Sequence, residues 1–197
     1  MRLGIVGGTF DPMHNGHIAA AEAAIECAEL DEVVFVPTGT PPHRPPTVAS
    51  SDQRLEMCRL ATADDPRFSV SDVEVKRSGP SYTVDTLLAL RAANPHAELF
   101  LVLGWDAAAL FRSWHRPDEV LALAPIVVVT RPGRRSPGSQ DLAAAGLQPG
   151  RVVVCERATP AVSASAIREA VREGRSIAEL VPEAVARFIS SAHLYGA

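Results

Sequence analysis

The sequence lacks the features that would place it in a membrane, secretory or nucleic-acid-binding class. No apolar run approaches the roughly 18 residues that a membrane-spanning helix needs. The N-terminal residues reach glycines too early to form the apolar core of a signal peptide, so we expect a cytoplasmic protein with no membrane segment. The formal net charge of -4 argues against nucleic acid as a partner. Any polyanion that the chain binds should therefore be small and held locally.

Cysteine is scarce as well, and its spacing argues against two kinds of site. Cys27, Cys58 and Cys155 are far apart, odd in number and without CxxC spacing. Such a set indicates reduced, mostly structural thiols, with neither a disulfide framework nor a zinc site. No carboxylate cage for a metal ion is visible either. A GxGxxG dinucleotide-binding fingerprint is also absent.

The sequence does contain a regular alternation of short apolar runs with helical segments. Strands are expected at 3–6, 32–37, 68–75, 98–103, 126–130 and 151–155, the third of them peripheral because it alternates apolar and polar residues. Helices are expected at 16–30, 51–64 with Ser51 or Asp52 as cap, 118–123 and 182–194, and also from Val84 and after Ser163. This alternation predicts an α/β fold with a doubly wound parallel sheet. The 197 residues fit a single domain, with a C-terminal helical part from about 163.

The turn after the first strand is the strongest candidate for a binding site. Gly7 and Gly8 let the backbone turn sharply and approach a ligand closely. The helix that follows presents unpaired N–H groups at its start, and these favour an anion. His14 and His17 stand at that start. The two histidines alone are ambiguous, because HxxH spacing also suits a metal pair and an isolated histidine is often structural.

Two further segments have either a role in ligand binding or a purely structural role. The Pro-rich segment 38–50 carries His43 and Arg44, which either bind a ligand at the sheet edge or lie on a stiff surface connection. Tyr82 and Thr83 precede a helix, where a surface aromatic and a plain N-cap are the simpler interpretation.

The second half of the chain adds an aromatic and a second helix start. Trp114 either packs in the core or serves as a stacking platform, and its polar neighbours argue against full burial. Ser163, Ser165 and Arg168 gather at one helix start, which makes either a second anion site or a capped surface helix. The arginines in the loop at 131–138 either lie solvated on the surface, which is the simpler interpretation, or supply one contact to a phosphate.

A family resemblance favours the functional readings. Residues 7–17, GGTFDPMHNGH, closely resemble the GGTFDPxHxGH signature of the nucleotidylyltransferases that carry an HxGH motif. Further segments resemble bacterial nicotinate-nucleotide adenylyltransferase in order and spacing, over nearly the whole chain. They are PPHR at 41–44, GPSYT at 79–83 with DTL at 85–87, GWD at 104–106, SW at 113–114 and VSASAIR at 162–168. The resemblance implies a Rossmann-like nucleotidylyltransferase fold.

The resemblance also implies a reaction and the residues that carry it. The expected activity is transfer of AMP from ATP to nicotinate mononucleotide, giving nicotinate adenine dinucleotide and pyrophosphate in NAD biosynthesis. His14, His17 and Arg168 are implied as catalytic, with Mg²⁺ bound through the ATP phosphates. The implied ATP contacts are Gly7, Gly8, Thr9, Phe10, His43, Arg44, Gly104, Asp106, Ser163 and Ser165.

The implied acceptor site recognises the acid form of the nucleotide. The resemblance places Thr83, Trp114 and His115 around the nicotinate carboxylate and ring, with Tyr82 nearby. Backbone N–H donors would accept a carboxylate and reject the amide of nicotinamide. Alternatives are an enzyme with nicotinamide mononucleotide as acceptor and a non-catalytic nucleotide-binding regulator. The oligomeric state stays open.

The chain departs from the family pattern at a few positions of these motifs. Ala164 stands where many members have a second serine, and Ala166 stands where some have aspartate. His115 occupies a position that is often tyrosine. One hydroxyl contact to the phosphates is therefore missing.

Overall fold

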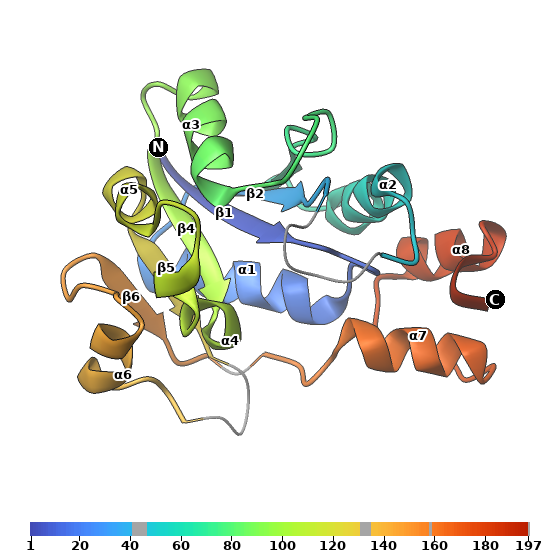
Figure 1. The fold of residues 1–197 in the computed structure, drawn as a ribbon. Helices are drawn as coiled ribbons and strands as arrows, with labels where there is room; N and C mark the ends of the chain where they lie inside the picture. Colours follow the sequence, from blue (N-terminus) through green and yellow to red (C-terminus); the bar gives the residue numbers. More distant parts are fainter. Residues whose placement is uncertain (41–46, 131–134, 158, 197) are drawn as a thin grey trace.

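Six parallel strands form one sheet at the centre of the molecule (Figure 1). The computed structural model describes residues 1–40, 47–130, 135–157 and 159–196. The strands are β1 (Arg2–Gly8), β2 (Glu32–Pro37), β3 (Phe68–Val70), β4 (Glu98–Gly104), β5 (Ile126–Val129) and β6 (Val152–Cys155). Their order is β3-β2-β1-β4-β5-β6, so the winding reverses between β1 and β4. Doubly wound sheets bind ligands beyond the strand ends at that point. The predicted α/β fold is confirmed.

Helices cover both faces of this sheet, because alternate residues of a buried strand point to opposite sides. In β1, Ile5 packs with α3 and α5, whereas Val6 packs on the other face with α1 and α8. The helices are α1 (Asn15–Ala28), α2 (Ser51–Thr62), α3 (Thr83–Ala93), α4 (Trp105–Ala108), α5 (Pro117–Leu123), α6 (Ser139–Ala144), α7 (Ala164–Arg172) and α8 (Glu183–Ser191), with 3-10 turns at Phe111–Ser113 and Leu194–Gly196. In the described ranges, no helix is long and apolar enough to cross a membrane.

The strand predicted at 68–75 is shorter than expected. β3 ends at Val70, and only the Ser71 N–H continues its pairing, with a 2.9 Å bond to the Phe35 carbonyl. The chain then turns away from β2 and carries Glu74 inward, where its side chain is buried. Alternation of apolar and polar residues therefore reflects two different surroundings here. The peripheral position of this strand is confirmed, since β3 lies at the edge of the sheet.

Three local features differ from the sequence-based expectation. α2 is capped by Ser50, not by Ser51 or Asp52. The Gln53 N–H donates to Ser50 Oγ at 3.2 Å, and the Ser50 N–H donates to Gln53 Oε1 at 2.9 Å, which is a capping box. The second feature is the start of α3, which begins at Thr83 and has Tyr82 at the N-cap position, so Thr83 is not the cap. The third feature is α6, which was not predicted because it is short and follows a Gly- and Pro-rich segment.

Cys27 and Cys155 form a disulfide, so the prediction of reduced thiols is wrong for this pair. Cys27 lies near the end of α1 and Cys155 ends β6, and 128 positions separate them in the chain. They meet because α1 packs across the sheet face onto β6. An ion pair between Arg157 and Glu26 joins the same two segments. Spacing alone could not reveal this contact, which depends on the tertiary fold. Cys58 is a free, buried thiol, as predicted.

Candidate active site

The turn that follows β1 is anchored in the core by the side chain of Phe10. Phe10 is buried, adopts a positive φ of 52°, and packs edge-on against Phe35 with ring centroids 6.0 Å apart. A Cβ at Gly8 would lie 2.8 Å from the Phe10 ring, so glycine is required at that position. A Cβ at Gly7 would instead meet no atom within 4 Å. The backbone of the strand end is therefore open on the Gly7 side.

Asp11 connects this turn to two distant parts of the chain through hydrogen bonds. Its carboxylate accepts hydrogen bonds from the Val48 N–H at 2.8 Å, the Ala49 N–H at 3.1 Å and the Tyr195 hydroxyl at 2.7 Å. Burial raises the pKa of Tyr195, and the bond to Asp11 raises it further, so Tyr195 remains a donor. Neither residue was singled out from the sequence, because their partnership spans nearly the whole chain.

Arg54 places a buried positive charge beneath the same turn. Its guanidinium donates to the Thr9 carbonyl at 2.7 Å and to the Thr38 carbonyl at 2.6 Å. Burial lowers the pKa of Arg54, and the nearby Asp11 carboxylate opposes that shift. The sequence predicts a helix at 51–64 but gives no sign of this role of Arg54. The guanidinium joins the carboxyl ends of β1 and β2.

The two predicted catalytic histidines lie together at the start of α1. Their rings stack with centroids 3.6 Å apart and an interplanar angle of 16°. The His14 N–H donates to His17 Nδ1 at 3.3 Å, and the Phe10 ring meets His17 edge-on at 4.9 Å. A Cβ at Gly16 would lie 3.1 Å from His14 Nδ1, which accounts for the glycine of the HxGH motif. His14 is buried and His17 is partly exposed.

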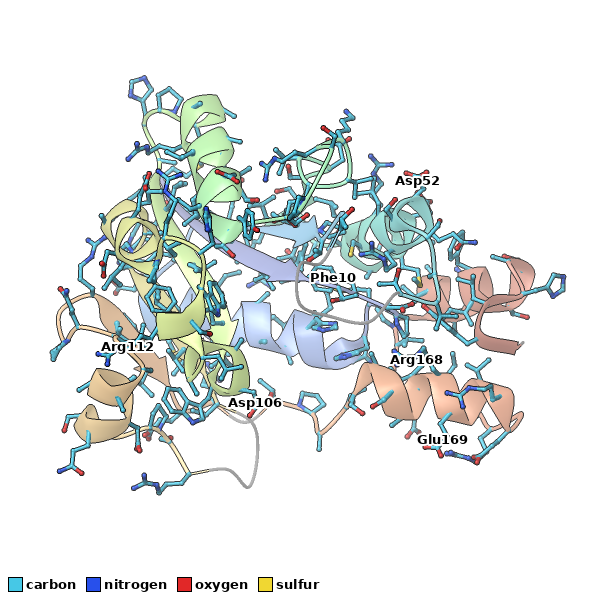
Figure 2. The ribbon with its side chains drawn as sticks, viewed as in Figure 1. Phe10, Asp52, Asp106, Arg112, Arg168 and Glu169 are labelled. Carbon is cyan, nitrogen blue, oxygen red and sulfur yellow. A yellow bond between two sulfur atoms is a disulfide. The ribbon has the colours of Figure 1, made fainter. Side chains whose placement is uncertain are left out.

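The start of α7 lies beside the start of α1, although about 150 residues separate them in the chain. The Pro160 carbonyl oxygen is 3.6 Å from the position of a Cβ at Gly16, and Arg168 donates to the Asp11 carbonyl at 2.7 Å. Figure 2 shows Arg168 reaching from α7 toward the turn that contains Phe10. The two predicted anion-binding helix starts are thus neighbours.

The serines at the start of α7 are arranged as an N-cap. Ser163 Oγ accepts from the Ala166 N–H at 3.3 Å, as predicted for a capping residue, and lies 3.2 Å from Ser165 Oγ. Ser165 is exposed and Ser163 is partly exposed. Both hydroxyls and the free N–H groups of this helix start are therefore accessible to an anion.

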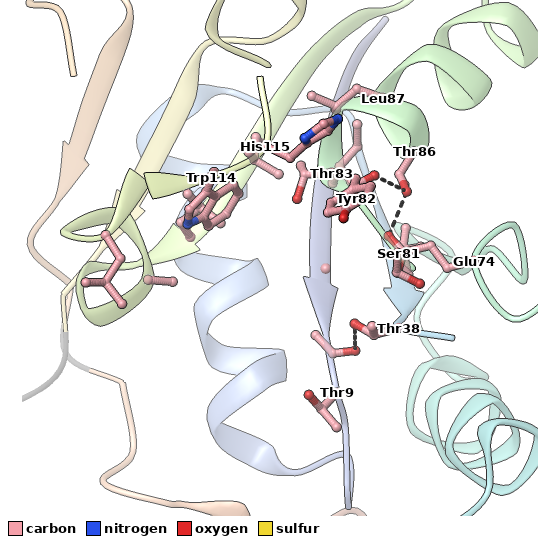
Figure 3. A pocket seen from close by; sticks show the side chains of 18 of the residues that line it. Thr9, Thr38, Glu74, Ser81, Tyr82, Thr83, Thr86, Leu87, Trp114 and His115 are labelled. Carbon is pink, nitrogen blue, oxygen red and sulfur yellow. Dashed lines mark hydrogen bonds between the residues drawn. The ribbon is translucent and has the colours of Figure 1, made fainter. Parts of the chain in front are cut away.

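A cavity of about 610 Å³ opens on the other side of β1 (Figure 3). We call it the Tyr82–Trp114 cavity. It is lined by Ile5, Gly7, Gly8, Thr9, Val36, Thr38, Glu74, Ser81, Tyr82, Thr83, Thr86, Leu87, Leu101, Leu103, Ala107, Leu110, Ser113, Trp114 and His115. All four predicted acceptor-binding residues are in this lining, together with three of the predicted ATP contacts from the turn after β1. The cavity therefore meets the turn at Gly7 to Thr9.

Aromatic rings form the upper part of this cavity. The Tyr82 and His115 rings stack with centroids 4.2 Å apart, and so connect the start of α3 to the segment before α5. Trp114 is partly buried against Phe111, at 5.5 Å between centroids. The expectation that Trp114 is not fully buried is confirmed. Its indole faces the cavity across from Tyr82 and Thr83 (Figure 3).

The remaining predicted residues occupy other positions. Gly104 ends β4 and Asp106 lies in the first turn of α4. Both are exposed and outside the lining of the cavity. The Phe10 side chain belongs to the core. His43 and Arg44 lie outside the described residues. Within the described ranges, no group of three or more His, Cys, Asp or Glu side chains gathers as a metal site.

Comparison with known sequences gives a consistent result. The cytidylyltransferase-like family model matches residues 5–170. A "probable nicotinate-nucleotide adenylyltransferase" of Leifsonia xyli is 44% identical over 194 residues, which cover 98% of this chain and 94% of the relative. The protein of the same description in Dehalococcoides mccartyi is 40% identical over 199 residues, covering 99% and 97%.

Solved structures share the fold. Nicotinic acid mononucleotide adenylyltransferase of Plasmodium falciparum complexed with NaAD has a TM-score of 0.79 at 16% identity, covering 98% of this chain and 97% of that chain. The same enzyme complexed with APC has a TM-score of 0.77 at 16% identity, covering 98% and 96%.

Proposed function

Since the chain belongs to the cytidylyltransferase-like family and, within it, to the nicotinate-nucleotide adenylyltransferases, we propose that it transfers AMP from ATP to nicotinate mononucleotide. The products are nicotinate adenine dinucleotide and pyrophosphate. One observation carries this proposal beyond the family name. The Tyr82–Trp114 cavity and the paired starts of α1 and α7 meet at the turn after β1, which suits a reaction between two phosphate-bearing substrates.

The chemical step needs positioning and neutralisation of charge. Both substrates carry phosphates that repel each other, so the protein must hold the acceptor phosphate in line with the α-phosphorus of ATP. On this proposal, His14 and His17 contact the phosphates and stabilise the charge that develops in the transition state, each by a few kcal/mol. No covalent intermediate is needed. The acceptor phosphate oxygen attacks, the bond between the α- and β-phosphates breaks, and pyrophosphate leaves.

The triphosphate is proposed to lie across the two neighbouring helix starts. Ser163, Ser165 and Arg168 would hold the β- and γ-phosphates, because hydroxyls, N–H groups and a guanidinium are all donors to an anion. Gly104 and Asp106 would approach the ribose of ATP. We also propose that His43 and Arg44 close over the phosphates, on the basis of the family motif alone.

A divalent metal ion generally accompanies ATP in nucleotidyltransferases. We propose that this metal is Mg²⁺, which the triphosphate would carry to the site. The donor groups near the two helix starts are hydroxyls, imidazoles and a guanidinium, which suit phosphate oxygens better than a bare cation. The metal would therefore neutralise phosphate charge and add to the effect of Arg168.

The acceptor is proposed to occupy the Tyr82–Trp114 cavity with its carboxylate at the start of α3. Backbone N–H groups at Thr83 and near Trp114 and His115 would donate to the nicotinate carboxylate, with an aromatic ring stacked on the pyridine. Nicotinamide would present its NH₂ group to the same donors and leave them unpaired. The cavity should therefore favour the acid over the amide.

The domain organisation and the location of the protein are also part of this proposal. Ile167 of α7 and Val185 of α8 belong to the hydrophobic core that contains Phe10 and Val6. This supports one nucleotidylyltransferase domain over 1–197, with its C-terminal helical part packed on the rest. We propose a cytoplasmic location because ATP is a substrate.

The decisive experiment compares the two pyridine mononucleotides. Purified protein, ATP and Mg²⁺ are incubated with nicotinate or nicotinamide mononucleotide, pyrophosphate release is followed, and the product is identified by its mass. We expect the acid to be favoured by at least about tenfold in kcat/KM, the size of one lost buried hydrogen bond. Equal use of the amide would contradict the carboxylate site. No turnover of either would support a nucleotide-binding regulator.

A further inference from the structure

Glu74 is an acidic side chain in the wall of a cavity that we propose for an acidic substrate. Its relative exposure is 6%, and it is among the few buried charged residues of the described chain. It lies in the segment between β3 and α3 and borders the Tyr82–Trp114 cavity below Tyr82 (Figure 3). A buried carboxylate costs free energy unless donors surround it, so its neighbours decide what it does.

The neighbours of Glu74 come from both sides of the cavity wall. Thr86, in the first turns of α3, donates its hydroxyl to Glu74 Oε1 at 2.7 Å, and Arg77 donates to Thr86 Oγ1 at 3.2 Å. The Ser81 hydroxyl and the Gly39 N–H lie beside the carboxyl group. Thr86, Ser81 and Glu74 itself all line the cavity. The carboxyl group therefore lies between α3 and the segment that follows β2.

The backbone around Glu74 is packed just as closely. A Cβ at Gly39 would lie 2.2 Å from the Glu74 carbonyl oxygen, so only glycine lets these two segments touch. One residue further, the Ser81 N–H donates to the Thr40 carbonyl at 3.0 Å, and Thr40 and Pro80 form an isolated bridge. Segment 38–40 is thus fixed against 74–81, which leads directly into Tyr82 and Thr83.

Burial dominates the electrostatics of Glu74. Burial raises the pKa of Glu74, and the hydrogen bond from Thr86, the nearby Ser81 and Gly39 groups and the Arg77 guanidinium offset that rise only in part. The folded state therefore disfavours the charged form of this side chain. A neutral side chain of similar size would avoid that cost.

We propose that Glu74 is a positioning residue for the acceptor, which joins the start of α3 to segment 38–40 and so fixes the Thr83 N–H relative to the turn after β1. This inference rests on the proposed function, because it takes the Tyr82–Trp114 cavity as the site of nicotinate mononucleotide. Glu74 acts through Thr86 and the first turn of α3 and does not itself contact the reacting atoms.

The test separates positioning from simple stability. In Glu74→Gln, the amide oxygen still accepts from Thr86, but the NH₂ group faces the Gly39 and Ser81 donors. We expect the KM for nicotinate mononucleotide to rise about tenfold, the size of one disrupted buried hydrogen bond. The KM for ATP should stay near its wild-type value, and the thermal unfolding midpoint should not fall. Thr86→Val removes the donor on the other side and should raise the same KM without adding to Glu74→Gln in the double variant.

The control is Asp72→Asn, which removes a carboxylate on the same segment that pairs with Lys76 at 2.9 Å and lies outside the cavity. It should leave both KM values unchanged. An unchanged acceptor KM in Glu74→Gln would overturn the inference, and so would a rise in both KM values together with a lower unfolding midpoint. Wild-type protein that makes no nicotinate adenine dinucleotide would overturn the proposed function instead.

Discussion

The acceptor side and the triphosphate side of the proposed site differ in how much protein surrounds the ligand. The Tyr82–Trp114 cavity is a hollow lined by strands, by α3 and by aromatic rings. The starts of α1 and α7 instead present partly exposed groups, among them His17, Ser163 and Arg168. A small aromatic acid needs shape and unpaired donors for recognition, whereas a flexible triphosphate needs charge and N–H groups from several elements. Specificity should therefore reside in the cavity and rate in the helix starts.

The largest effect is expected from His17, where the two sides meet. His17→Ala should lower kcat by about 1,000-fold, because one donor to the developing charge is lost. Both KM values should change much less, since the ring contributes mainly in the transition state. Steady-state pyrophosphate release measures this, and circular dichroism checks the fold.

The matched control for His17 is His96→Ala, which removes an exposed histidine far from the motif in the chain. It should retain wild-type activity. Near-normal turnover by His17→Ala would remove the catalytic assignment and leave the helix starts as binding groups only.

The second prediction concerns the disulfide, which links the end of α1 to the end of β6. Cys27 and Cys155 join α1, which carries the histidines, to β6, which leads toward α7. Reduction should lower the free energy of unfolding by about 3 kcal/mol, because the reduced chain gains conformational freedom when unfolded. Urea unfolding with and without reductant measures this difference.

A double variant sharpens the disulfide prediction. With Cys27→Ser and Cys155→Ser combined, the unfolding curve should no longer respond to reductant. Disulfides are rare in the cytoplasm, so a wild-type curve that ignores reductant as well would mean that the pair is reduced in the purified protein.

The third prediction concerns the binding of the triphosphate by Arg168. Arg168→Lys keeps the positive charge but loses the planar fork that donates to the Asp11 carbonyl. We expect the KM for ATP to rise about tenfold and the KM for nicotinate mononucleotide to stay unchanged. Arg172→Lys, at the exposed end of the same helix, is the control and should behave as wild type. Equal rises in both KM values would contradict the division into two sides.

The two sides also differ in what the sequence revealed. The helix starts could be predicted, because Gly7-Gly8, the histidines and Ser163 act through local backbone geometry that short motifs encode. The long-range contacts that support the elements carrying these starts could not be predicted. Asp11 with Tyr195, and Cys27 with Cys155, are partners across most of the chain, and no spacing rule connects them.

The burial of Glu74 in the cavity wall could not be predicted from the sequence for a related physical reason. The alternation at 68–75 is typical of a strand with one wet face, but it breaks at Ser71 and Asp72 and so does not assign Glu74 to either face. In the fold, the chain leaves β2 after Ser71, and the same residue is buried among donors from α3 and segment 38–40. Burial of a single charged residue depends on which distant segments surround it, and a period-two pattern carries no information on that.

The smallest expected effect is on stability, and it tests whether the buried Glu74 carboxylate lowers the free energy of unfolding. The pKa of Glu74 is raised above its ordinary value in the folded state, chiefly by burial. Above the unfolded pKa of about 4.5, the folded protein therefore holds more protons than the unfolded chain. Stability should fall as the pH rises from there through the folded pKa. Glu74→Gln cannot titrate, so its stability relative to wild type should increase over the same window.

Urea unfolding of both proteins at a series of pH values measures that difference, with Asp72→Asn as the reference for a partly exposed carboxylate. A pH-independent difference between Glu74→Gln and wild type would mean that the carboxylate is well solvated. In that case the wall of the cavity would be as open as the triphosphate side. A difference that grows with pH, together with weaker acceptor binding, would show that the buried Glu74 carboxylate lowers the free energy of unfolding while it improves acceptor binding.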